Sequence, residues 1–86
     1  MIYNIQTNNL SGDAALQFYE SITTSEEYSN VTQLNLTLNE SCIVDVVGIA
    51  VLIRLYSHGI RVQIENTSPE IRSLFIPLGI DKFFFS

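Results

Sequence analysis

Basic side chains are scarce in this 86-residue chain. Only Arg54, Arg61, Arg72 and Lys82 stand against nine acidic residues, which gives a formal net charge of −5. A surface with this balance repels the phosphates of nucleic acids and of anionic lipids. We therefore expect neither nucleic acid nor an anionic membrane among the partners of this protein.

Cysteine is almost absent too. Cys42 is the only one, so it has no partner for an intramolecular disulfide, and a reducing compartment fits best. The first six residues carry no basic group, and Asp45 interrupts the longest apolar run well short of a bilayer's thickness. We expect a cytoplasmic protein without membrane insertion, folded as a single domain over residues 1–86 because 47% of its residues are apolar.

The residues that usually carry chemistry are few and scattered. The four glycines stand alone, whereas a loop that cradles phosphate needs several of them near a helix start. His58 and Cys42 fall in different predicted elements, so we expect no metal site and no nucleophile paired with a base. His58 suits the end of a helix, and Cys42 suits the core. The sequence thus predicts a protein that is not an enzyme and has no cofactor.

Apolar periodicity alternates between that of strands and that of helices. Strands are expected at residues 3–6, 31–38 and 60–65. Three helices are expected between and after them: one capped near Ser11 and packing through Leu16, Tyr19 and Ile22, one over residues 46–57, and one from Ser68–Pro69 to Pro77. An aromatic tail, Phe83 to Phe85, closes the chain. It either folds back into the core or joins two copies in a homo-oligomer.

The predicted strands are apolar on one side only. Leu34, Leu36 and Leu38 alternate with polar residues, and a strand at 60–65 repeats the pattern. A sheet covered on both faces would instead show nearly continuous apolar strands. We therefore predict an α/β fold of βαβαβα order, with a single-layer mixed or parallel sheet of about four strands and helices mainly on one face.

The most informative stretch joins the second strand to the second helix. Asp45 can cap that helix, and Gly48 leaves its first turn bare. On a helical wheel Ile49, Leu52, Leu55 and Tyr56 face the sheet, whereas Val46, Val47, Ala50 and Arg54 face outward. Two interpretations stay open: a capped core helix with a few scattered apolar surface residues, or a protein-binding face at the helix start.

Three motifs resemble those of the STAS family, the sulphate transporter and anti-sigma factor antagonist domains. They are Asp45-Val46-Val47-Gly48, Glu65-Asn66-Thr67-Ser68-Pro69-Glu70 and Leu78-Gly79-Ile80-Asp81-Lys82-Phe83-Phe84. Residues 31–84 carry the resemblance, and the first thirty residues share only its topology. The family's opening segment is longer than the one here.

The resemblance implies an anti-sigma factor antagonist whose phosphorylation switch is missing. In such proteins a kinase phosphorylates a serine that follows the aspartate, but Val46 stands in its place here. Ser41 lies nearby as an alternative phosphosite. The implied binding residues are Asp45, Val46, Val47, Gly48, Ala50 and Arg54.

The implied partner is a regulatory protein of the anti-sigma or kinase-like kind, or a subunit of a larger assembly such as a lipid-transport ATP-binding cassette complex. The alternative function is that of a regulatory domain that binds a small ligand, a nucleotide or an anion, at the backbone N–H groups of the second helix.

Overall fold

Strands and helices alternate along the chain in the computed structural model, which describes residues 1–65 and 67–85, with residues 39 and 40 described by their backbone alone. The elements are β1 (Ile2–Leu10), α1 (Gly12–Thr24), the 3-10 helix η1 (Glu26–Tyr28), β2 (Gln33–Val44), α2 (Val46–Ser57), β3 (Arg61–Glu65), α3 (Pro69–Ser73), the 3-10 helix η2 (Ile76–Leu78) and α4 (Asp81–Phe84).

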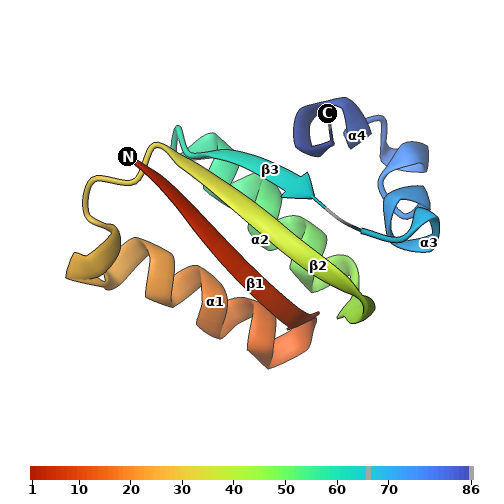
Figure 1. Ribbon diagram of the computed structural model, residues 1–86, viewed down its shortest axis with the longest axis horizontal. Coiled ribbons are helices and arrows are strands. Elements are labelled where there is room, and N and C mark those ends of the chain that lie inside the picture. The colour runs from red at the N-terminus through yellow and green to blue at the C-terminus, as the bar shows by residue number, and fades with distance from the viewer. Residues whose placement is uncertain (66, 86) are drawn as a thin grey trace.

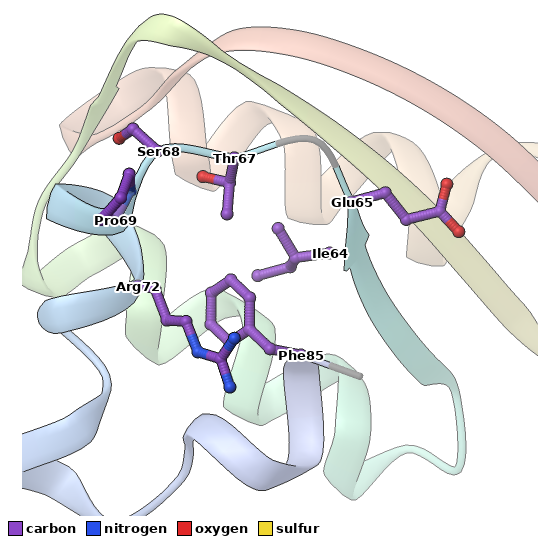
Figure 2. A pocket seen from close by; sticks show the side chains of 7 residues that line it. All are labelled: Ile64, Glu65, Thr67, Ser68, Pro69, Arg72 and Phe85. Carbon is purple, nitrogen blue, oxygen red and sulfur yellow. The ribbon is translucent and has the colours of Figure 1, made fainter.

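The sheet confirms the predicted α/β fold. Its three strands are parallel and follow the order β1-β2-β3, with Tyr3 beside Leu34 and Leu36 beside Ile64. Phe85 adds one parallel bridge to Ile64 at the β3 edge, in the place of a fourth strand (Figure 2). Because each strand pairs with the next one along the chain, α1 and α2 lie on one side of the sheet, α1 alongside β1 and α2 behind β2 and β3 (Figure 1).

Two strands are longer than expected. β1 continues past Gln6 to Leu10, and β2 begins two residues late and continues past Leu38 to Val44. The register shifts between Thr7, which pairs with Leu38, and Asn9, which pairs with Ile43. The β1–β2 ladder is therefore irregular between these two pairs and resumes after them. Neither the composition nor the alternation of the residues beyond Gln6 and Leu38 indicates such a continuation.

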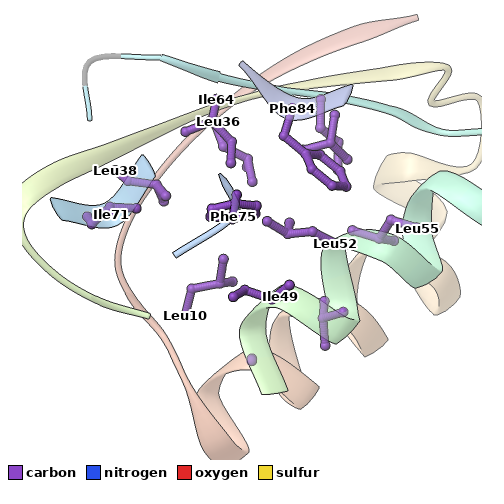
Figure 3. Close-up of a cluster of buried hydrophobic side chains, with 14 of the residues drawn as sticks. Leu10, Leu36, Leu38, Ile49, Leu52, Leu55, Ile64, Ile71, Phe75 and Phe84 are labelled. Atoms are coloured by element: carbon purple, nitrogen blue, oxygen red, sulfur yellow. The ribbon is translucent and has the colours of Figure 1, made fainter. Parts of the chain in front are cut away.

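The core lies between the sheet and α2. Leu36 of β2 and Leu52 and Leu55 of α2 point into one cluster between the sheet and the helix (Figure 3). These three side chains are fully buried, as are Leu34 and Leu38 of β2. The predicted inner face of α2 is right for Ile49, Leu52 and Leu55. It is wrong for Tyr56, which is 42% exposed because its ring turns toward Phe83, with 5.5 Å between centroids.

The predicted inner face of α1 is right for Ile22 and Tyr19 and wrong for Leu16. Ala15 and Ile22, two turns apart, are its buried residues, and Tyr19 packs partly against the core. Leu16 lies about 100° around the helix from Ala15 and is 51% exposed. The small Ala15 side chain permits a close approach, and this approach leaves Leu16 at the surface.

The C-terminal segment folds back onto the sheet. The expected third helix ends early, at Ser73, and Pro77 lies in η2. The expected tail instead forms the short helix α4, in which Phe84 packs against Phe75 with 5.8 Å between ring centroids. Phe84 and Phe85 are buried in the core, whereas Phe83 is 53% exposed.

Two neighbouring phenylalanines should thus differ sharply in their contribution to stability. Phe84→Ala removes a buried ring, so we expect it to lower the free energy of unfolding by about 3–5 kcal/mol. Phe83→Ala, the matched control, should cost less than about 1 kcal/mol because half of that ring already contacts water. Urea denaturation followed by circular dichroism measures both, and equal losses would contradict the packing described above.

Candidate functional site at the start of helix α2

Asp45 holds the start of α2 and the start of α1 with one carboxylate. Its Oδ1 accepts a hydrogen bond from the Gly48 N–H at 3.0 Å, as expected of an N-cap. Its Oδ2 accepts a second bond, from the Gly12 N–H of α1 at 3.1 Å. Ser11, expected to help cap α1, makes no side-chain cap bond and donates its hydroxyl to Asn9 instead. The cap of α1 therefore comes from Asp45, 33 residues away in sequence.

Gly48 is buried where α2 crosses the end of β1. A Cβ atom at this position would overlap the carbonyl oxygen of Leu10. The expectation of a bare first turn is therefore wrong at Gly48, because the backbone of β1 covers it. Because Gly48 has no side chain, α2 can approach the sheet closely at this position. Gly48 therefore presents no side chain to a partner.

The outer side of the same turn is apolar and exposed. Val46 is 75% exposed and Ala50, one turn further on, is also exposed. Ile43, at the end of β2, is 60% exposed, and sequence reasoning missed it because the register shift between β1 and β2 changes which residues face outward. Val47 is half-buried and packs partly on the core. We refer to Ile43, Val46, Val47 and Ala50 together as the α2 patch.

The side chain of Arg54, which was predicted to belong to the binding face, reaches from α2 to α1. Its guanidinium carbon is 5.7 Å from the centre of the Tyr19 ring. The Tyr19 hydroxyl in turn forms a 2.8 Å hydrogen bond with Nε2 of His58, which is the C-cap residue of α2, as its position predicts. Arg54 is exposed but already has a contact, so it borders the α2 patch and helps hold α1 against α2.

The groups that could support catalysis lie apart. Cys42 is buried, as expected of a core thiol, and burial raises its pKa against the smaller opposing effect of the Leu10 backbone. His58 is at the end of α2 and Asp45 at its start, with the whole helix between them. Among residues 1–65 and 67–85, no three His, Cys, Asp or Glu side chains gather as metal ligands would.

Two further expectations concern single residues. Ser41, the alternative phosphosite, is an exposed residue of β2 and lies four positions before Asp45. Asn66, part of the second STAS-like motif, lies outside the described residues.

Within the described part of the chain, no helix has both the length and the apolar composition needed to cross a bilayer.

Comparison with known proteins adds no relative. A scan against protein-family models, a search of curated proteins and a search of solved structures each find no significant match to this chain.

The cap that Asp45 provides to both α1 and α2 leads to a stability prediction. Asp45→Ala removes the acceptors of two helix-start N–H groups, so we expect a loss of about 2 kcal/mol in the free energy of unfolding. Asp45→Asn keeps one acceptor oxygen and should lose about half as much. The control is Asp13→Ala, since Asp13 is in the first turn of α1 but no cap bond depends on it. Equal effects of Asp13→Ala and Asp45→Ala in urea denaturation would rule out the shared cap.

The close approach of α2 to β1 at Gly48 leads to a second stability prediction. Gly48→Ala forces α2 away from Leu10, and overpacking of this kind costs about 1–3 kcal/mol. A surface glycine in a helix would instead gain stability from the same change. Val46→Ala, on the exposed side of the turn, should change the unfolding free energy by less than about 0.5 kcal/mol. Thermal unfolding of the two variants compares the buried and the exposed side directly.

Proposed function

We propose that this chain is a non-catalytic protein-interaction module that binds a regulatory partner protein through the α2 patch. One observation carries the proposal: Val46 is 75% exposed on a turn whose backbone is fixed by Asp45 and Gly48. An apolar side chain presented on a rigid turn loses little conformational entropy when a partner covers it. Val46 and Ala50 lie one turn apart on the same side of α2. Neighbouring exposed apolar residues are typical of the buried centre of an interface.

The STAS resemblance supports the same surface. All three motifs occur where elements begin: Asp45 caps α2, the Ser68 hydroxyl caps α3, and Gly79, in the left-handed conformation at φ 70°, precedes α4. On this basis we propose an anti-sigma factor antagonist-like module. Valine has no hydroxyl, so Val46 cannot accept a phosphoryl group, and partner binding would be constitutive.

The proposed partner is an anti-sigma or kinase-like regulator, or a subunit of an assembly such as a lipid-transport ATP-binding cassette complex, in the cytoplasm. A nucleotide or anion at the start of α2 is the less favoured function. Asp45 already occupies the N–H groups of Gly48 and Gly12, and its negative charge would repel an anion there. Of the aromatic tail, only Phe83 stays exposed enough to join two copies.

Val46→Asp tests the proposal by placing a charge in the centre of the α2 patch. A buried, unpaired carboxylate in an interface should weaken partner binding by more than about tenfold. The fold should survive, because an acidic residue in the first turn of a helix suits the helix dipole. Affinity capture from native cytosol identifies proteins retained by the wild type, and calorimetric titration of the purified partner then measures the loss.

Leu78→Asp provides the matched control. Leu78 is 55% exposed in η2, outside the patch, and the variant carries the same added charge. We expect it to bind the partner as the wild type does. Equal retention by Val46→Asp and the wild type would sink the proposal, and equal loss in both variants would attribute the effect to net charge and place the interface elsewhere.

A further inference from the structure

A hollow of about 610 Å³ lies at the carboxyl end of β3, away from the α2 patch. Ile64, Pro69 and Phe85 form its apolar wall, and Thr67, Ser68 and Arg72 supply its polar groups (Figure 2). Its volume falls within the range of small-molecule sites, and its polar groups indicate which kind of ligand it suits.

Arg72 brings a positive charge to the hollow. Its guanidinium carbon lies 5.4 Å from the centre of the Phe85 ring, which orients the side chain beside the hollow. Among the described residues, Arg72 makes no ion pair. Glu65 also lines the hollow, but its carboxylate points away from the guanidinium (Figure 2).

Two hydroxyl groups complete the donor set. The Thr67 Oγ1 atom is buried and has no hydrogen-bond partner within the described part of the chain. A buried hydroxyl left in this way destabilises the protein unless something bonds to it. The Ser68 oxygen accepts a bond from the Ile71 N–H at 3.3 Å, which leaves its proton free to donate. Ser68 is the N-cap residue of α3, and Arg72 lies in the last turn of that helix.

We propose that this hollow binds an oxyanion, the phosphate or carboxylate group of a small molecule, through the Arg72 guanidinium and the Thr67 and Ser68 hydroxyls. All three groups donate hydrogen bonds, and the planar guanidinium can donate two in parallel to one oxyanion. The apolar wall excludes water on one side, which strengthens charge-assisted bonds. This site is separate from the proposed partner surface, and either one can be present without the other.

Titration with inorganic phosphate tests the site. Two-dimensional NMR of the wild type, at constant ionic strength, should show saturable shifts of the backbone signals of Thr67, Ser68 and Arg72. Arg72→Gln should weaken this binding by about tenfold or more, and Thr67→Val should weaken it by less. Arg61→Gln, which removes a charge from the exposed start of β3, should bind phosphate as the wild type does.

The outcomes are distinct. Because Arg72 is exposed, we expect Arg72→Gln to leave the NMR signals of the rest of the protein unchanged. Both Arg72→Gln and Arg72→Lys lose the packing of Arg72 on Phe85. Since Arg72→Lys keeps the positive charge, it should retain part of the phosphate binding. Absence of saturation in the wild type, or equal loss in Arg72→Gln and Arg61→Gln, would overturn the proposal. A parallel titration with acetate then shows whether the site prefers carboxylate to phosphate.

Discussion

The Asp45 carboxylate is the contact on which the rest of this fold depends. Leu10 pairs with Val44, so β1 and β2 end at the same level and the two following helices begin side by side. Two parallel helices bring their positive ends together, an arrangement that needs a negative group between them. Asp45 supplies it and accepts one hydrogen bond from each helix start. Gly48 completes the junction because its missing side chain lets α2 touch the backbone of β1.

This junction explains why an apolar surface can stay exposed without loss of structure. The helix start is fixed from inside, by a carboxylate and by the Leu10 backbone, so the outer side of the same turn contributes little to stability. The fold therefore requires of position 46 only what any first-turn position of a helix requires. Packing does not require an exposed valine at this position, and the proposed partner surface rests on that observation.

Local patterns in the sequence predicted the parts of the fold that local interactions determine. The α2 bounds, the one-sided strands and the cap by Asp45 all follow from neighbouring residues. The second bond of Asp45, to Gly12, could not be predicted because it depends on the register of two strands. The register shift between β1 and β2 likewise exposes Ile43 and leaves no mark on composition. Leu16 reaches the surface because the close packing of Ala15, and not hydrophobicity alone, decides how α1 is rotated.

The distribution of charge separates the two candidate sites at the carboxyl end of the sheet. With a net charge of −5, the chain repels anions at most of its surface, and at the start of α2 a carboxylate already occupies the helix N–H groups. The charge of Asp45 repels an anion at that end, whereas an uncharged, apolar surface meets no such repulsion. At the end of β3 the sign of the charge is reversed: within the described part of the chain Arg72 makes no ion pair, and the buried Thr67 hydroxyl has no hydrogen-bond partner. Parallel strands place their carboxyl ends at one edge, so the α2 patch and the hollow beside Arg72 lie at the same end of the sheet, and the opposite charges of Asp45 and Arg72 suit them to the different ligands proposed above.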